Sequence, residues 1–182
     1  EFVRKLDEGE YNIVYSARRV QSMQNSLVAI KVCKEVCSSQ EIDIMRYLGG
    51  CNEACVMPLL DAFASASLTA MLMLLFDCNL PQFFKSQPTG TNTAYNSVAR
   101  SVAKGLAHMH GKGILHLNLH AGCVMLKDLD SVLKVCVSNF GMVASTTWPF
   151  QEPSFDHLHE QWCRAPELFM AGSLQAVGSK QR

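Results

Sequence analysis

Apolar residues in the first part of the chain follow a strand pattern. Two short runs rich in β-branched and aromatic residues flank the turn Glu8-Gly9-Glu10, and an apolar run at 27–32 is interrupted only by Lys31. Two more apolar runs, at 58–63 and 70–76, are separated by small residues and predict two buried strands. The pattern therefore predicts several strands joined by short turns.

Helical periodicity appears in two later stretches. Residues 38–48 carry Ile42, Met45 and Leu48 at helical spacing, and Gly49-Gly50 follows as a stop signal. The clearest helix is predicted over Thr93–His110, with its apolar face formed by Val98, Val102, Leu106 and Met109. His108 and His110 are interpreted as surface or helix-end residues, because no third metal ligand recurs at a fixed spacing.

Composition narrows the class of protein. A chain of 182 residues with 48% apolar and 18% charged residues is typical of one globular domain. A formal net charge of zero gives no electrostatic reason to expect a nucleic acid or an anionic membrane as partner. The longest apolar run is too short to span a bilayer, and no charged segment followed by an apolar run opens the chain. We therefore expect an intracellular protein, cytoplasmic or nuclear.

Eight cysteines raise the question of a metal site. Cys33 and Cys37, followed by Cys51 and Cys55, form two C-x3-C pairs that superficially match a four-thiolate zinc set. Their neighbours are apolar, so buried free thiols are the favoured interpretation and zinc is the alternative.

The stretch from His116 to Gly141 reads HLNLHAGCVMLKDLDSVLKVCVSNFG. It resembles the catalytic loop, the following hairpin and the metal-binding turn of a protein kinase, in which the patterns are H-R-D-L-x-x-x-N and D-F-G. His116, Leu119, Phe140 and Gly141 match. The resemblance implies that Asn118 replaces the catalytic Asp, while Cys123 and Asn139 replace the two metal ligands. The resemblance therefore keeps the residues that pack in the family's core, whereas the catalytic and metal-binding residues are replaced.

Upstream segments extend this resemblance. The stretch 6–15 is similar to the kinase Gly-rich loop, but of its three glycines only Gly9 remains. Val28-Ala29-Ile30-Lys31 matches V-A-I-K, whose lysine contacts phosphates and pairs with a glutamate on the next helix. Glu41 is the candidate partner, although Ser38-x-x-Glu41 is also a capping box that would occupy this glutamate at the helix start.

The remaining segments follow the kinase order. By resemblance, Met73 is the gatekeeper and Leu74–Asp77, including Leu75, the hinge, while residues 79–84 form the short helix after it. Met45, Leu59, His116 and Phe140 would link the two lobes. Ala165-Pro166-Glu167 resembles the end of an activation segment and is most similar to the cyclin-dependent-kinase-like (CMGC) group. The implied nucleotide-binding residues are Gly9, Val14, Ala29, Lys31, Glu41, Met73, Leu75 and Met125.

The implied fold is α+β with two lobes, a mainly antiparallel N-lobe sheet with one helix and a partial helical C-lobe. We expect residues 1–76 to form the N-lobe-like part and 77–182 the hinge and a truncated C-lobe, so that the chain is one kinase-like domain. A lower face left uncovered by this truncation would need a partner.

The implied chemistry is impaired. The neutral amide of Asn118 cannot accept the substrate proton, and the thiol of Cys123 and the amide of Asn139 are poor ligands for magnesium, which prefers hard oxygen donors. ATP remains the candidate cofactor, whereas magnesium binding is expected to be weak. His120 stands where the family usually has a phosphate-contacting lysine, and we consider it as a substitute base or, alternatively, as an ordinary loop histidine.

Three functions are compatible with these residues. The favoured one is a pseudokinase, a catalytically impaired kinase-like domain acting as a protein-interaction or allosteric module, with ATP as a ligand and a kinase, a cyclin-like protein or a scaffold as partner. The second is a Ser/Thr protein kinase that transfers the ATP γ-phosphate with atypical residues. The third is a non-functional fragment.

Overall fold

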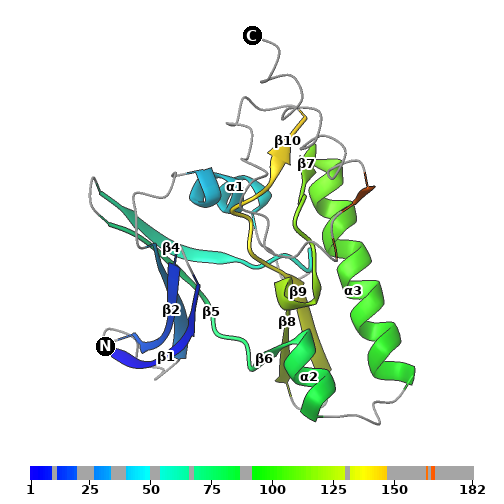
Figure 1. The fold of residues 1–182 in the computed structure, drawn as a ribbon, viewed down its shortest axis with the longest axis horizontal. Coiled ribbons are helices and arrows are strands. Elements are labelled where there is room, and N and C mark those ends of the chain that lie inside the picture. The colour runs from blue at the N-terminus through cyan, green and yellow to red at the C-terminus, as the bar shows by residue number, and fades with distance from the viewer. Residues whose placement is uncertain are drawn as a thin grey trace, which may run out of the picture.

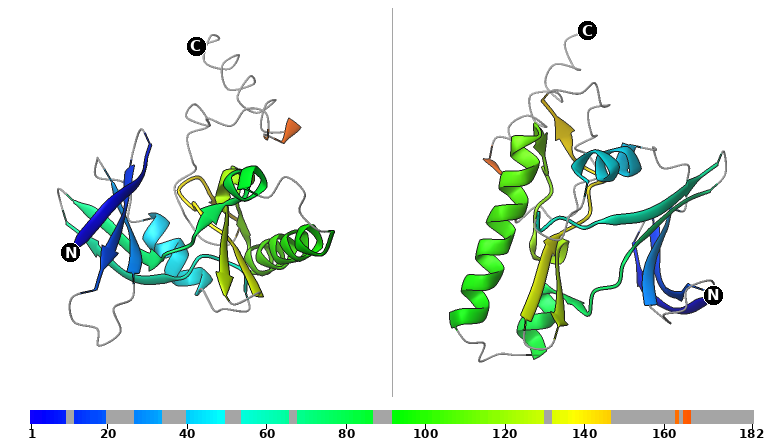
Figure 2. Two further views of the ribbon diagram at one scale, coloured as in Figure 1. Left: turned by 90° about the horizontal axis from the view of Figure 1, so that it is seen from below. Right: turned by 180° about the vertical axis from the view of Figure 1, so that it is seen from behind.

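The computed structural model describes residues 1–9, 12–19, 27–33, 40–49, 54–65, 68–86, 92–129 and 132–146, together with 163, 165 and 166. They form two lobes (Figure 1). A five-stranded sheet with one helix makes the first lobe, and one short and one long helix with two small sheets make the second. Seen from behind, the N-terminal strands (blue) lie on the right and the longest helix (green) on the left (Figure 2). The predicted α+β, two-lobe architecture is confirmed.

The first lobe is an antiparallel sheet with the strand order β1-β2-β3-β5-β4. Its strands are short, and β2 and β3 are rich in β-branched residues, which favour strands. They are β1 (Phe2–Glu8), β2 (Asn12–Arg18), β3 (Leu27–Cys33), β4 (Leu59–Ala64) and β5 (Thr69–Leu74).

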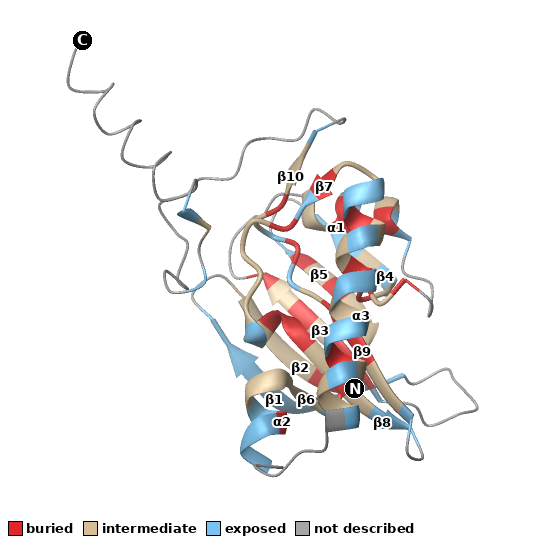
Figure 3. Cartoon of the chain, turned by 90° about the vertical axis from the view of Figure 1, so that its right-hand side faces the viewer, coloured by how far each residue is buried: buried red, intermediate tan, exposed pale blue. Residues whose placement is uncertain are grey.

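The prediction that 58–63 forms a buried strand is wrong. Strand β4 lies at the edge of the sheet and exposes most of its residues, including Leu60 and Phe63. The run looked buried because it is apolar, but an edge strand is covered on one side only. The best-buried strand of this sheet is the central β3, whereas β1 at the opposite edge is exposed along its whole length (Figure 3).

Helix α1 (Gln40–Leu48) packs against the first lobe through Ile42, Ile44, Met45 and Leu48. It ends at Gly49, whose φ of 57° is the left-handed conformation that glycine adopts without strain. Ser38, the expected first residue of a capping box, lies outside the described residues.

The C-terminal end of α1 is tied to the second lobe. His108 bonds through Nε2 to the carbonyl oxygen of Leu48 at 2.8 Å, and Lys112 donates from Nζ to that of Tyr47 at 2.8 Å. The Tyr47 hydroxyl in turn donates to the Lys112 carbonyl oxygen at 3.3 Å. Last-turn carbonyls of a helix lack intrahelical partners, so these contacts satisfy groups that would otherwise need water. His108 is therefore a helix-anchoring residue rather than an ordinary surface residue.

The second lobe is built around a long helix. Its helices are α2 (Leu80–Ser86) and α3 (Asn92–Gly111), with a 3₁₀ turn η1 (Ala121–Cys123). Its strands are β6 (Cys78–Asn79), β7 (Ile114–Leu115), β8 (Val124–Leu129), β9 (Val132–Val137) and β10 (Ala144–Ser145), arranged as sheets β6-β8-β9 and β10-β7. The long helix and the hairpin expected after the catalytic-loop-like stretch are thus both present.

One continuous core joins the two lobes. Met45, Met71, Met109, Val137 and Phe140 belong to the same buried cluster, although they come from different elements. The segment 55–57 connects them, because Met57 donates its N–H to Val137 and Val137 donates to Cys55. Helix α3 approaches this segment so closely that a Cβ added at Gly105 would lie 2.7 Å from the Cys55 carbonyl oxygen.

Apolar side chains of α2, α3 and the following loop line an open groove of about 620 Å³. It includes Phe84, Val98, Val102, Leu106 and Leu119. The described residues leave this side of α3 partly uncovered.

Two further expectations concern cysteines and membranes. Cys33 and Cys55 are free thiols, Cys37 and Cys51 lie outside the described residues, and the described part of the chain holds no group of three potential metal ligands. None of its helices is long and apolar enough to cross a membrane.

The close approach at Gly105 yields the first prediction. Gly105→Ala should lower the free energy of unfolding by about 1–3 kcal/mol, because the new Cβ would collide with the Cys55 carbonyl and crowd Val137. At an open helix position the same change would stabilise by up to about 1 kcal/mol. Urea unfolding measures the difference.

Gly111→Ala in the same helix is the matched control, since no atom lies within 4 Å of its added Cβ. Equal stability of the two variants would contradict the close packing of α3 on the 55–57 segment.

Candidate functional site

A cavity of about 600 Å³ lies between the five-stranded sheet and the β8–β9 hairpin. This volume is in the range of small-molecule sites. All eight residues that the sequence assigned to nucleotide binding line it: Gly9, Val14, Ala29, Lys31, Glu41, Met73, Leu75 and Met125. His120 and Asn139 also line it, whereas Asn118 and Cys123 do not.

One face of the sheet forms an upper wall of the cavity. Val14 pairs with Lys31 and Ala29 pairs with Met73 in the strand register, so their side chains point to the same side. Met125 on β8 lies on the opposite wall. The resulting slot is apolar on both walls, which suits a flat, aromatic ligand.

The segment that joins the two lobes supplies polar groups at the back of the slot. Phe76 is buried, and within the described part of the chain neither its N–H nor its C=O has a hydrogen-bond partner. Buried backbone groups are normally paired, so this adjacent donor and acceptor are available to a ligand. The resemblance identified Leu74–Asp77 as the hinge, but it did not show which of its backbone groups are unpaired.

The neighbouring groups of this segment are fixed to β8. Lys127 donates from Nζ to the Leu75 carbonyl at 2.9 Å, and the Asp77 N–H donates to Leu126 at 3.0 Å. The Asp77 carboxylate accepts from the Asp128 N–H at 2.9 Å. These bonds were not predicted from the sequence, because Lys127 belongs to none of the recognised motifs. Leu75 thus lines the cavity with its carbonyl already occupied.

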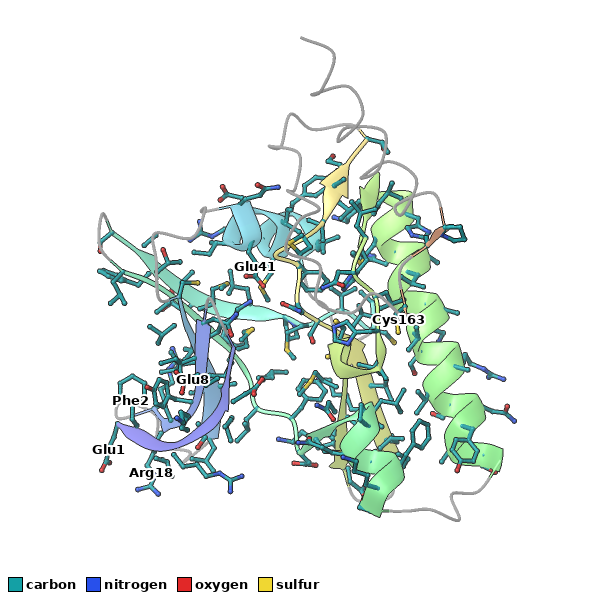
Figure 4. All side chains as sticks on the ribbon, viewed as in Figure 1. Glu1, Phe2, Glu8, Arg18, Glu41 and Cys163 are labelled. Carbon is teal, nitrogen blue, oxygen red and sulfur yellow. The ribbon has the colours of Figure 1, made fainter. Side chains whose placement is uncertain are left out.

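Lys31 and Glu41 form the predicted ion pair. The Lys31 Nζ donates to both carboxylate oxygens of Glu41 at 2.8 Å, and the side chains are only 10% and 12% exposed. Figure 4 shows Glu41 on the side of α1 that faces the sheet. Its carboxylate also lies within 4 Å of where a Cβ of Gly141 would stand. The pair therefore joins the sheet, α1 and the turn after Phe140.

The three degenerate positions contact one another instead of facing the cavity together. Cys123 is buried, and its thiol donates to the Asn118 carbonyl oxygen at 3.4 Å. Asn139 donates from Nδ2 to the Cys123 sulfur at 3.9 Å. Asn139 has a φ of 69°, a conformation that asparagine tolerates better than most residues. Sulfur thus occupies the centre of the group.

His120 caps the short η1 turn. Its Nδ1 accepts a hydrogen bond from the Gly122 N–H at 3.2 Å. In the neutral ring the proton then sits on Nε2, which makes the free nitrogen a donor. A Cβ at Gly122 would lie 2.8 Å from the His120 ring, so a side chain here would force the ring to move. The geometry weakens the idea of His120 as a substitute base, since the accepting nitrogen is already used.

His116 is a buried structural residue. Its Nε2 lies 3.0 Å from the Ser138 carbonyl oxygen, its ring centroid is 5.8 Å from that of Phe140, and its Nδ1 has no partner. Burial lowers the pKa of His116 below its usual 6.5, while the bond to the Ser138 carbonyl opposes that shift. His116, Phe140 and Met45 are all fully buried, with Leu59 packed against the same core.

The activation-segment motif is only partly visible. Ala165 and Pro166 are described, but Glu167 and Thr147 lie outside the described residues. Thr146 is exposed and donates through its hydroxyl to the Gly113 carbonyl at 3.2 Å.

Comparison with known proteins agrees with this geometry. A family model described as "Protein tyrosine and serine/threonine kinase" matches residues 1–177. Among curated proteins, the mitogen-activated protein kinase SLT2/MPK1 of Saccharomyces cerevisiae is 25% identical over 94% of this chain and 38% of its own length. The serine/threonine-protein kinase crk1 of Schizosaccharomyces pombe is 30% identical over 92% of the chain and 50% of its own length.

A plant relative gives the same picture. Cyclin-dependent kinase B2-2 of Arabidopsis thaliana is 26% identical over 98% of the chain and 60% of its own length. The chain spans about half the length of the curated relatives it matches.

The buried ion pair yields a prediction about stability. Glu41→Met should lower the free energy of unfolding by about 3 kcal/mol, because it leaves the Lys31 ammonium buried without its carboxylate. The double variant Lys31→Met with Glu41→Met should recover most of this loss, since two apolar side chains need no charge partner. Chemical denaturation of both single variants and the double variant measures the coupling. Strictly additive losses would refute it.

His116 yields a prediction about pH. Above its unfolded pKa of 6.5 the ring is neutral in both states. As the pH falls below that value, the unfolded chain takes up a proton that the folded state resists, so stability is lost. His116→Gln should lose less stability than the unchanged chain between about pH 7.5 and about pH 5.5 in urea unfolding.

The exposed residue His110 provides the control, and His110→Gln should keep the full acid sensitivity. An unchanged pH dependence in His116→Gln would mean that other groups account for the effect.

Proposed function

The chain belongs to the protein kinase family, and we propose on that premise that it is a pseudokinase. In this proposal it keeps the cavity between the lobes and binds a nucleotide there, but it does not transfer phosphate at a useful rate. It acts instead through its shape, as a protein-interaction or allosteric module.

The observation that carries the proposal is the position of Cys123. Its sulfur lies between Asn118 and Asn139 and is bonded to both. Phosphoryl transfer in this family depends on positioning and on neutralising charge at the phosphates. Here two amides and a thiol stand at those positions, and the thiol contacts the Asn139 side chain and the Asn118 backbone carbonyl. No carboxylate comes from any of the three.

These residues do not fit a magnesium site. Magnesium requires hard oxygen ligands in octahedral geometry, and a buried thiol is a soft donor. The Asn139 side chain donates from its nitrogen to the Cys123 sulfur and offers a metal ion only one neutral oxygen. Among the described residues no three potential ligands of the His, Cys, Asp and Glu types come together. The proposed function therefore involves no metal ion at these positions.

Neither Asn118 nor His120 is suited to accept the proton of the substrate hydroxyl. Asn118 can accept a hydrogen bond through its side-chain oxygen, but its amide does not take up a proton near neutral pH. The Nδ1 atom of His120 is occupied by the Gly122 N–H. A hydroxyl placed at this site would be oriented and not activated.

Nucleotide binding fits the cavity better than catalysis does. The apolar walls accept a flat base, and the free N–H and C=O of Phe76 offer one donor and one acceptor to its edge. Lys31 is held in place by Glu41 before any ligand arrives. A site of this kind is preorganised for binding.

A protein is the proposed partner. The names of the cyclin-dependent relatives refer to cyclin. We propose for this chain a partner of that general class, or a kinase or scaffold. The described cysteines form no disulfides, which suits a reducing compartment, so we propose the cytoplasm or nucleus as its location.

A second candidate is an active Ser/Thr protein kinase. The specific observation in its favour is the assembled Lys31–Glu41 pair, which is a required part of the active arrangement in this family. It would need a source of charge neutralisation other than Cys123 and Asn139.

Label transfer from γ-labelled ATP separates the two candidates. We expect transfer by the unchanged chain to equal that of the Lys31→Met and Glu41→Met double variant, because the acids that support the reaction are absent. In the same preparations ATP should raise the melting temperature equally with magnesium and with a chelator.

Magnesium-dependent transfer that disappears in Lys31→Met would establish the second candidate and end the pseudokinase proposal. The double variant serves as the folded reference, since its stability is expected to be close to that of the unchanged chain.

A further inference from the structure

The two peptide groups that flank Phe76 are each bonded to β8 at one end. The Leu75 carbonyl oxygen accepts from the Lys127 Nζ at 2.9 Å. The Asp77 N–H donates to the Leu126 carbonyl oxygen at 3.0 Å. The Leu75 C=O shares its peptide group with the Phe76 N–H, and the Asp77 N–H shares its peptide group with the Phe76 C=O. Both peptide groups are therefore held by the atom that does not belong to Phe76.

These bonds determine the directions of the Phe76 backbone groups. A peptide group is planar, and in its trans form the C=O and the N–H point in opposite directions. None of the described peptide bonds is cis. Because the bonded atoms of Leu75 and Asp77 point at β8, the N–H and the C=O of Phe76 both point away from it. Phe76 is buried and lines the cavity, and within the described residues neither of these groups has a partner.

The two bonds differ in what maintains them. Asp77 is bonded to β8 through backbone atoms alone, next to the pairing of Cys78 with Leu126 that joins β6 to β8 (Figure 1). The peptide group between Leu75 and Phe76 is instead held by a side chain, that of Lys127. A rotation of this peptide group would present the Leu75 C=O to the cavity in place of the Phe76 N–H. The direction of the donor therefore depends on Lys127.

Lys127 itself lies outside the cavity. It is half-buried on β8 and does not line the cavity. A hydrogen bond from an ammonium group to a carbonyl oxygen is stronger than one between neutral groups. Any influence of Lys127 on a bound molecule must pass through the peptide group that it holds.

We propose that Lys127 is a positioning residue, which directs the Phe76 N–H into the cavity and so makes the site select ligands that offer a hydrogen-bond acceptor there. The proposal rests on the nucleotide-binding cavity of the proposed function and assigns part of its selectivity to a side chain outside it. A ring that lacks this acceptor gains nothing from Lys127.

Isothermal titration with adenosine and three analogues tests the proposal. In each analogue a C–H group replaces one of the ring nitrogens N1, N3 and N7. Lys127→Met should weaken adenosine binding about three- to tenfold, because the donor is no longer held in place. This loss should disappear for the one analogue that lacks the acceptor for Phe76 and persist for the other two. An equal loss for all four ligands would overturn the proposal, since Lys127 would then only support the fold.

Two further variants serve as controls. Lys127→Arg keeps the charge and the donors, so it should restore most of the adenosine affinity. Lys134→Met removes the same charge from the same hairpin, because Lys134 stands opposite Lys127 in the strand register and does not line the cavity. It should leave adenosine binding unchanged. An equal loss in Lys134→Met and Lys127→Met would show that only overall charge matters and would refute the positioning role.

Nuclear magnetic resonance of the ligand-free protein provides a second readout. The resonances of the Leu75 carbonyl carbon and the Phe76 amide should shift in Lys127→Met and return in Lys127→Arg. Resonances that do not move would overturn the role of Lys127 while leaving a nucleotide-binding pseudokinase intact. Absence of adenosine binding by the unchanged chain would instead overturn the nucleotide site of the proposed function and, with it, the selectivity.

Discussion

A lysine ammonium buried in the central strand of a sheet must have a carboxylate next to it, and much of this structure follows from that requirement. Lys31 lies on β3 with its side chain in the cavity wall, so its counter-charge has to arrive from outside the sheet. Glu41 supplies it from the first turn of α1, and the apolar face of the same helix then packs into the core. The Glu41 carboxylate also approaches Gly141, which brings the turn after Phe140 to the sheet. One charge pair thereby fixes a sheet, a helix and a loop from the other lobe.

The residues at the three impaired positions behave as a self-contained group. Cys123 is bonded to Asn118 and Asn139, His120 accepts from Gly122, and Asp7 accepts from Glu8. These groups have hydrogen-bond partners within the protein, while the Nε2 atom of His120 remains a donor on the cavity side. The cavity can therefore keep its form without a ligand, which agrees with a role that depends on shape.

Local pattern was sufficient to predict the strands of the first sheet and the α1 and α3 helices, because each rests on nearby residues. The Lys31–Glu41 pair was predicted from the resemblance to V-A-I-K together with the need of a buried ammonium for a counter-charge. The pattern was misleading for β4, where an apolar run indicates a strand but not whether that strand lies at an edge. It could not reveal the bond from Lys127 to Leu75 or the free groups of Phe76, since these depend on how distant segments meet. The motif comparison named the impaired positions, but only the folded chain shows that they bond to one another.

Helix α1 is tied to the second lobe through hydrogen bonds at its C-terminal end. Its last carbonyls are held by His108 and Lys112 of the other lobe, whereas Glu41 near its start is held by a single ion pair. A rotation of the helix about Leu48 would therefore move its N-terminal end the most. Glu41 lies seven residues away, about 10 Å along the axis, so a tilt of about 15° would carry its carboxylate roughly 3 Å from Lys31. Such a tilt would open the charge pair, and it would also displace Ile42 and Ile44, so the pair is coupled to the packing of the helix in the core.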